Sequence, residues 1–407
     1  MSRLKTHIIN FISLIINRGI DSLVGIVVIP LLLYKIGANS YGEIVIAQSI
    51  SYIGISIINY GTDILLLQKI PLYLDRKKNK AISSVISNVV VFRFIIFCVY
   101  SLISITILHV TNYNDTIIKY YYIFLLLCLA EVFSISHVLV VYKDVKILPI
   151  LSSVRLIIVL LITIIFVNRD NGGIIYVCGF SISYLITYLI ITFYTIKRYK
   201  ISIVIGNFIK SFRGVIKRST PFFISKLNTY ASDKFFNLLG GIFISISFAA
   251  FLDVAFKILQ VIVIPVQILS TIILSDRENR EKVSNNFKME QKILLFSFII
   301  AFIIFLFQNL ILKYYSLSAY SFPNLCLSLL IFSSIFYNIS IFMGENVMVT
   351  KHMSRFIIKS SVIPPLIIIP LLICISFFLK AEIIFAILFF LQKLFEMCMR
   401  IYYIKKY

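Results

Sequence analysis

The stretch KILLFSFIIAFIIFLFQNLILK (292–313) carries no charged residue between its two lysines. An α-helix needs roughly 20 mostly apolar residues to cross the hydrocarbon core of a bilayer. Runs of similar length recur along the chain, for example at 9–34, 43–66 and 356–379. A transmembrane β-barrel would instead show short segments of alternating polarity. The spanning segments are therefore predicted to be helices, whose backbone groups are satisfied within each segment.

The composition excludes a soluble globular protein. Of the 407 residues, 60% are hydrophobic and 14% are charged, whereas a soluble domain carries about a quarter charged residues. The net charge of +22 resides mainly between the apolar runs, so it indicates topology signals and contacts with anionic lipid rather than a nucleic-acid partner. The six cysteines lack CxxC spacing, so we expect no disulfide framework and no metal site.

The charged breaks between apolar runs predict about twelve transmembrane helices. Alternating loops between two sides places most of the 39 Lys and Arg residues on one side. The other side has only Lys35, Lys119, Arg169, Lys313 and Lys380. The positive-inside rule then predicts that both termini are cytoplasmic. The expected spans are 9–34, 43–66, 83–110, 117–141, 147–167, 173–196, 219–243, 247–274, 292–313, 320–343, 356–379 and 381–403.

Six of the expected spans precede residues 201–218 and six follow them. This arrangement predicts two six-helix lobes, at 1–200 and 219–407, joined by a cytoplasmic linker at 201–218. The linker has apolar residues at helical spacing and Lys210, Arg213 and Lys217 on the opposite face. This pattern is typical of an amphipathic helix that lies on the inner membrane surface. Duplicated halves are common in transporters.

Polar residues within the spans follow the spacing of one helix face in the first two helices of each half. Charges in the hydrocarbon cost roughly 2.5–3.5 kcal/mol each on insertion scales, so they usually face a cavity or a partner. We therefore expect these four helices to surround a central hydrated cavity between the lobes. The candidate substrate-binding residues are Arg18, Asp21, Asn59, Asp63, Lys226, Tyr230, Asp233, Lys234, Asp253 and Lys257.

Some of these charges have a simpler interpretation as pairs that fix helix packing. Arg18–Asp21, Asp253–Lys257 and Lys393–Glu396 have suitable spacing for such pairs. The remaining interior charges, Arg93, Glu131 and Arg155, are isolated in sequence, and His109 and His137 are expected to be structural. Lys226 and Lys234 are harder to explain by packing, because Asp233 alone does not neutralise both. An excess of positive charge favours an anionic substrate such as a phosphate headgroup.

Two stretches of the chain resemble a known family. The segment NRGIDSLVGIVVIPLLLYKIGANSYGEIVIAQSISYIGISIINYGTDILLLQKI (17–70) contains Pro30, the Lys35–Gly37 turn, Tyr41–Gly42 and Tyr60–Gly61 in the order seen at the start of O-antigen and polysaccharide repeat-unit flippases. The segment PFFISKLNTYASDKFFNLLGG (221–241) is similar to the seventh helix of that family. These flippases belong to the multidrug/oligosaccharidyl-lipid/polysaccharide exporter superfamily.

The resemblance implies a non-enzymatic flippase in the bacterial cytoplasmic (inner) membrane that acts in O-antigen or lipopolysaccharide biosynthesis. It would move an undecaprenyl-pyrophosphate-linked oligosaccharide by alternating access. Arg18, Lys226, Lys234 and Lys257 would attract the anionic headgroup, and the nearby aspartates would pair with them or carry coupling ions. No cofactor is implied, and coupling to protons, to sodium or to the substrate gradient stays open. The partners would be the lipid-linked oligosaccharide and the bilayer, and whether a polysaccharide polymerase and a chain-length regulator are further partners stays open.

Two other functions remain in competition. A membrane-embedded polysaccharide polymerase would usually carry a long external loop, and no predicted outer loop here is long. The sequence also lacks the GxxxxGK[ST], HExxH and GxSxG motifs. A small-molecule exporter on a twelve-helix scaffold is the second alternative. An exporter of organic cations would favour an acidic cavity, whereas the polar stripes contain at least as many basic as acidic groups.

Overall fold

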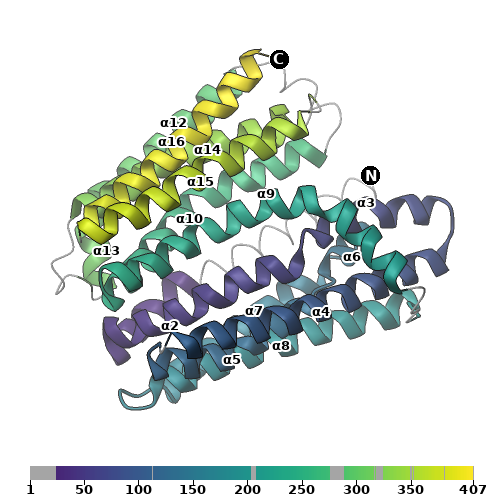
Figure 1. Cartoon of the computed structure of the whole chain (residues 1–407), viewed down its shortest axis with the longest axis horizontal. Helices are drawn as coiled ribbons and strands as arrows, with labels where there is room; N and C mark the ends of the chain where they lie inside the picture. Colours follow the sequence, from purple (N-terminus) through teal and green to yellow (C-terminus); the bar gives the residue numbers. More distant parts are fainter. Residues whose placement is uncertain are drawn as a thin grey trace. The chain divides into compact units, whose positions relative to one another are not determined.

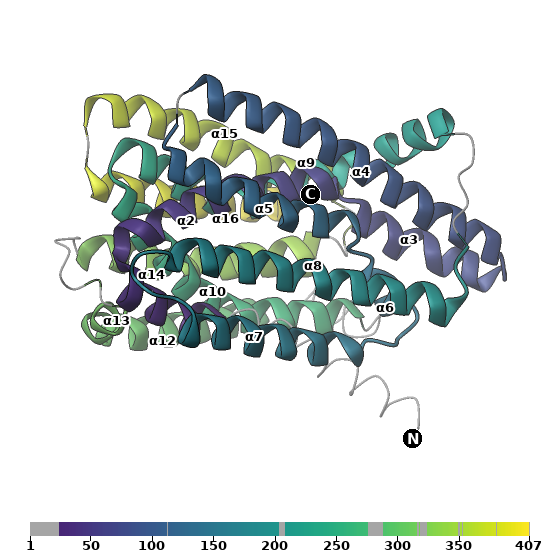
Figure 2. The ribbon, with the colours of Figure 1, turned by 90° about the horizontal axis from the view of Figure 1, so that it is seen from below.

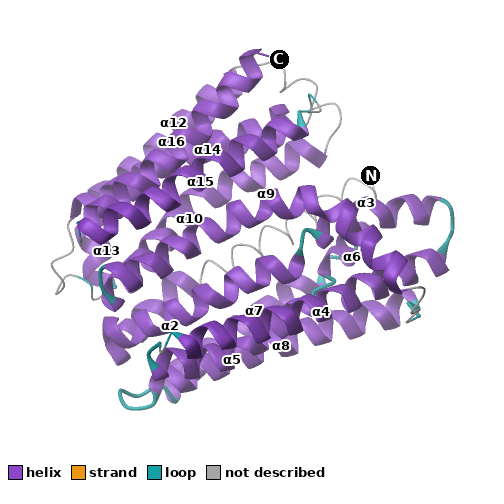
Figure 3. Cartoon of the chain, viewed as in Figure 1, coloured by secondary structure: helices purple, strands orange, loops and turns teal. Residues whose placement is uncertain are grey.

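The computed structural model describes residues 24–111, 113–202, 208–275, 288–315, 317, 324–348, 351, 353–379 and 381–406. All regular secondary structure in these residues is helical (Figure 3). Eight helices among them are long and apolar enough to cross a membrane, or nine if one bent pair counts as a single span. This confirms the predicted all-helical, multi-pass membrane architecture. Most of the first expected span, 9–34, lies outside the described residues.

The chain divides into two compact units, whose bounds differ from those of the predicted lobes at 1–200 and 219–407. Unit 1 comprises Met1–Val24 and Ile46–Lys234, and unit 2 comprises Gly25–Val45 and Phe235–Tyr407. Neither unit is contiguous in sequence. Helices α2 (Ile29–Asn59) and α9 (Phe208–Phe243) each contribute residues to both units.

Unit 1 is built on long apolar helices that run side by side. Helix α8 packs against α5 and α7, and α4 packs against α5; α7 and α8 are adjacent in both ribbon views (Figure 1 and Figure 2). One face of α7 exposes large side chains such as Ile157, Leu161 and Ile164. Such a face suits lipid, where the backbone is already satisfied within the helix. The helices of this unit are α3 (Thr62–Asp75), α4 (Asn79–Val110), α5 (Asp115–Val132), α6 (Ser136–Val141), α7 (Ile147–Ile165) and α8 (Gly172–Tyr199).

Two of the expected spans in unit 1 are interrupted. The span expected at 43–66 ends at Asn59, and a new helix, α3, begins at Thr62. Between them Tyr60 and Gly61 have positive φ angles of 48° and 69°. The span expected at 117–141 is likewise split into α5 and α6 by a non-helical segment at residues 133–135. Each interruption frees backbone groups that need partners within the membrane.

The linker helix differs from the expectation. Helix α9 starts at Phe208 and continues without interruption through the seventh predicted span to Phe243. The apolar residues Phe212, Val215 and Ile216 pack against a buried cluster formed by α3, α4 and α6. The ring of Phe212 lies 5.0 Å from that of Phe92, centroid to centroid. These described residues of the linker's apolar face therefore pack against protein.

Unit 2 is organised around α14 (Asn324–Phe342), which contacts α10 (Ile246–Ser275), α12 (Lys288–Leu306) and α16 (Glu382–Lys406). Helix α15 (Ser354–Phe378) packs against α16. Buried small residues along α14, including Ser333 and Ser334, let neighbouring helices approach closely. The span expected at 292–313 is bent by 62° between α12 and α13 (Gln308–Tyr314).

Helix α2 enters unit 2 through a tight contact. After a kink at Gly37, which has φ 79°, Tyr41 and Gly42 reach the start of α10. A Cβ atom at Gly42 would lie 2.0 Å from the carbonyl oxygen of Ile246. Only glycine permits this approach of the two backbones. The contact brings Tyr41 to the polar residues of α10.

Replacing Gly61 by Ala is expected to lower the stability of the protein by about 1–2 kcal/mol, because a side chain is strained in the left-handed region. Gly61→Asn is expected to cost less, since Asn tolerates this conformation best after glycine. Thermal unfolding of the two detergent-purified variants measures the difference. Equal midpoints for Ala and Asn would show that backbone strain at residue 61 is not limiting.

Candidate functional site

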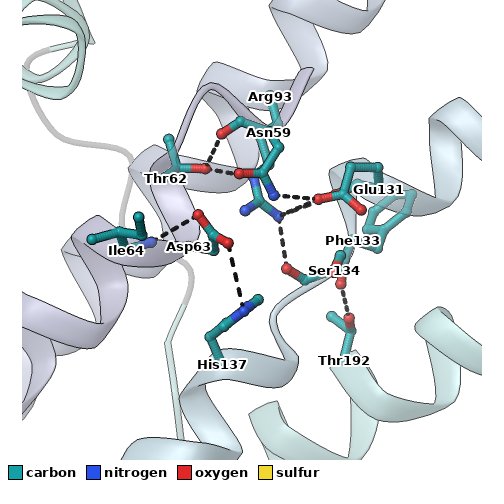
Figure 4. Close-up of polar contacts among 10 residues, drawn as sticks. All are labelled: Asn59, Thr62, Asp63, Ile64, Arg93, Glu131, Phe133, Ser134, His137 and Thr192. Carbon is teal, nitrogen blue, oxygen red and sulfur yellow. Dashed lines mark hydrogen bonds and ion pairs between the residues drawn. The ribbon is translucent and has the colours of Figure 1, made fainter. Parts of the chain in front are cut away.

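The interruption between α5 and α6 is stabilised by Arg93 from α4, as Figure 4 shows. Arg93 is fully buried. Its Nη1 donates to the carbonyl oxygens of Glu131 and Ser134, at 3.1 and 2.7 Å. The carbonyl of Glu131 also accepts the backbone N–H of Ser134 at 3.1 Å, and Ser134 itself lies in the non-helical segment. A cation at the end of α5 also interacts favourably with the helix dipole.

The same arginine connects this interruption to the one between α2 and α3. The Nε of Arg93 donates to the Oγ1 of Thr62 at 2.8 Å, and that hydroxyl donates to the carbonyl of Asn59 at 2.5 Å. The side-chain amide of Asn59 donates to the Oε1 of Glu131 at 2.6 Å. Glu131 Oε1 also lies 3.7 Å from the Nη1 of Arg93. Arg93 and Glu131, which are isolated in sequence, are therefore paired in the structure.

Asp63 lies at the first turn of α3, beside this network. Its Oδ1 accepts the backbone N–H of Ile64 at 2.8 Å, as expected for a carboxylate at a helix N-terminus. Its Oδ2 lies 3.6 Å from the Nε2 of His137 on α6. The pair is ionic when His137 is protonated. His137, expected to be a lone structural histidine, thus faces a carboxylate.

A second polar cluster lies in unit 2 and surrounds the fully buried Asp253 of α10. Its Oδ2 accepts hydrogen bonds from the hydroxyl of Tyr41 at 2.8 Å and from the Nζ of Lys257 at 2.6 Å. Its Oδ1 accepts from the side-chain amide of Asn237 at 3.2 Å. Lys257 also donates to the Tyr41 oxygen at 3.3 Å. The predicted Asp253–Lys257 pair is present, with two further partners.

A third cluster, also in unit 2, surrounds Glu396 and shows that the predicted Lys393–Glu396 pair is wrong. Glu396 binds the Nη2 of Arg400 at 2.6 Å rather than Lys393. The Nζ of Lys393 instead lies over the rings of Tyr337 and Phe389, 4.1 and 4.8 Å from their centroids. In unit 1, Arg155 similarly lies over the ring of Tyr184 at 3.8 Å. Cation–π contacts thus stabilise two of the interior charges.

The buried ion pairs of the two units share one property. The buried carboxylates of the described residues each have a basic side chain of the same unit within 2.6 to 3.7 Å. A buried charge without a partner costs several kcal/mol. The pairs are Asp63–His137, Glu131–Arg93, Asp253–Lys257 and Glu396–Arg400. Much of the interior charge is therefore balanced within each unit.

The structure separates the predicted site residues into groups. Asn59 and Asp63 belong to the Arg93 network of unit 1, and Asp253 and Lys257 form the cluster of unit 2. On α9, Asp233 is half-buried, and the Nζ of Lys234 lies 5.2 Å from the ring centroid of Tyr52. Arg18 and Asp21 lie outside the described residues, as do the side chains of Lys226 and Tyr230.

Sequence reasoning missed Thr62 and Tyr41 as members of these clusters. Thr62 follows a left-handed glycine, and nothing in the local sequence shows that its hydroxyl accepts from an arginine 31 positions away. Tyr41 was noted only as part of a Tyr-Gly pair. The sequence signals for the unit 1 network were the polar stripe that contains Asn59 and Asp63 and the ionisable residues Arg93 and Glu131 in apolar helices.

Solved structures with the same fold are transporters. The inward-facing structure of a multidrug resistance MATE family transporter of the MOP superfamily matches with a TM-score of 0.71 and 11% identity, covering 95% of this chain and 96% of the other. The eukaryotic MATE transporter AtDTX14 matches with a TM-score of 0.70 and 13% identity, covering 99% and 96%. A MOP superfamily transporter from Pyrococcus furiosus, with a binding pocket described as having reverse polarity, matches with a TM-score of 0.64 and 11% identity. The match covers 99% of this chain and 95% of the other.

No protein-family model matches the sequence, and no curated protein matches it. The fold and the apolar helices define a multi-pass membrane protein. More particularly, the chain has the two-lobed fold of the MATE transporters of the MOP superfamily along nearly its whole length.

Proposed function

We propose that this chain is a transporter that works by alternating access, with its two lobes as the moving parts. The observation that carries the proposal is the fold, which coincides with that of solved transporters over at least 95% of the chain. Interior charges that are balanced within each unit suit this mechanism, because a lobe that moves as a body keeps its own pairs intact. We place the protein in the bacterial cytoplasmic membrane.

A small-molecule substrate is the candidate that the solved structures favour, since several of them are multidrug or other MATE transporters. The pairing of Lys257 with Asp253 also removes one of the four basic residues assigned to an anionic headgroup. Such an exporter would use the polar residues of α9, including Asp233 and Lys234, to contact its substrate.

A lipid-linked oligosaccharide is the second candidate, and the sequence favours it. The segments 17–70 and 221–241 resemble the repeat-unit flippases, and α9 carries the basic residues Lys226 and Lys234 near a single Asp233. In this case an undecaprenyl-pyrophosphate headgroup would contact the two lysines. A polysaccharide polymerase and a chain-length regulator are then the proposed partners.

Purified protein in proteoliposomes distinguishes the two candidates. One assay follows efflux of a fluorescent organic cation, and the other follows movement of a pyrophosphate-linked polyprenyl sugar between leaflets. If the substrate is the lipid-linked sugar, Lys226→Ala with Lys234→Ala is expected to slow its movement roughly tenfold or more, because charge-assisted hydrogen bonds are worth about 1.5–3 kcal/mol. Dye efflux would be absent.

If the substrate is a small organic cation, efflux is observed and removing the two lysines does not reduce it. Lys77→Ala is the matched control, since Lys77 is an exposed residue in the turn after α3. Failure of the inserted, folded protein to move either substrate would contradict both candidates.

A further inference from the structure

The cluster around Asp253 brings a carboxylate, a phenolic hydroxyl and a side-chain amide together. Its carboxylate is fully buried and is surrounded by the hydroxyl of Tyr41 and the side-chain amide of Asn237. The Oδ1 of Asn237 is buried and has no hydrogen-bond partner. A rotation of this amide by 180° about its last bond would direct the oxygen toward the carboxylate in place of the nitrogen.

The ammonium group of Lys257 occupies the place beside Asp253 where a cation would bind. The Nζ of Lys257 lies 2.6 Å from Asp253 Oδ2 and 3.3 Å from the Tyr41 oxygen. Asp253 and Lys257 are four residues apart on α10, the spacing at which side chains share one helix face. The ammonium therefore contacts two of the oxygens that a bound monovalent cation would use.

The stem of Lys257 lies close to the backbone of another segment, at Gly25. A Cβ atom at Gly25 would lie 3.0 Å from the Lys257 Cδ. The lysine side chain keeps 24% of its surface exposed, whereas that of Asp253 has none exposed. The ammonium thus covers the buried carboxylate from the more accessible side.

We propose that the ammonium of Lys257 serves as a tethered cation for an oxygen site formed by Asp253, Tyr41 and Asn237, and that removing it creates a binding site for Na⁺. Oxygen ligands from a carboxylate, a phenol and an amide suit a hard cation. In the native protein the site is complete without an ion from solution. It follows that sodium does not drive transport through this site. This consequence rests on the proposed transport function.

The test compares full-length wild type with Lys257→Met in detergent, using thermal unfolding in NaCl and in choline chloride of equal ionic strength. Methionine keeps the length of the side chain but leaves Asp253 without its counter-charge. We expect the wild-type midpoint to be the same in both salts. We expect Lys257→Met to unfold at a lower temperature in choline and to gain about 5 °C, saturably, with Na⁺.

The double variant Lys257→Met/Asp253→Asn is the control, and its midpoint is expected to be insensitive to the choice of cation. Should Lys257→Met not fold, Lys257→Gln replaces it, and binding of radioactive Na⁺ provides a second readout. A folded Lys257 variant with no Na⁺-specific response, or a wild type that Na⁺ stabilises through Asp253, would overturn the proposal. Because these assays measure binding only, a failed transport assay would not change their outcome.

Discussion

Replacing Arg93 by Ala is expected to destabilise the protein by about 3–5 kcal/mol, the usual cost of removing one partner of a buried ion pair. The change leaves the carboxylate of Glu131 without its cation and the carbonyl groups of Glu131 and Ser134 without the hydrogen bonds from the arginine. It also removes the connection to Thr62 at the start of α3. The unfolding midpoint of the detergent-purified protein measures the loss.

Arg93→Lys is the matched control. Lysine keeps the charge, but a single ammonium does not reproduce the planar fork that reaches Thr62 and both carbonyls. We expect an intermediate loss. Adding Glu131→Gln to Arg93→Ala should restore part of the stability, because the uncompensated charge disappears. If Arg93→Ala were as stable as wild type, the arginine would not stabilise the two interruptions.

Replacing Gly42 by Ala is expected to prevent normal packing of α2 on α10. The added Cβ would lie 2.0 Å from the carbonyl oxygen of Ile246. A backbone oxygen does not move aside as a side chain does, so the helices must separate, at a cost of about 1–3 kcal/mol or more. Tyr41, the neighbouring residue, then loses its contact with Asp253. We expect a lower unfolding midpoint and less protein recovered as a single species by size-exclusion chromatography.

Gly214→Ala is the control for this substitution. Gly214 lies within α9, and a Cβ there would meet nothing within 4 Å. Alanine favours a helix over glycine by roughly 0.5–1 kcal/mol, so this variant should be as stable as wild type or more stable. Equal behaviour of Gly42→Ala and Gly214→Ala would contradict the close approach of α2 and α10.

The sequence was sufficient for the helical membrane architecture, because hydropathy is a property of contiguous residues. The ends and interruptions of helices were less predictable. No proline or glycine marks the break at residues 133–135. The break is stabilised by hydrogen bonds from Arg93, about 40 positions earlier. The linker helix was predicted to lie on the membrane from its amphipathic pattern alone. The packing partners of Phe212 and Val215 come from distant parts of the chain, and that pattern does not identify them.

The same distinction applies to the candidate sites. Asp253–Lys257 was predictable, because the two residues are one helical turn apart. Spacing predicted Lys393 as the partner of Glu396, but Arg400, which is also one helical turn away, forms the ion pair, and Lys393 lies over two aromatic rings. Whether Asn59, Asp63, Asp233 and the other predicted residues contact a substrate stays a prediction.

The discontinuous order of unit 2 has a consequence for biosynthesis. Tyr41 and Asp253 are 212 positions apart. At about 5–20 residues per second, the ribosome needs roughly 10–40 s between them. During this time α10 has not yet been synthesised, so residues 25–45 lack the helix that they contact in the folded protein. Lys257, in contrast, is synthesised within a second of Asp253 at that rate, so the counter-charge of the carboxylate is present before α10 is complete.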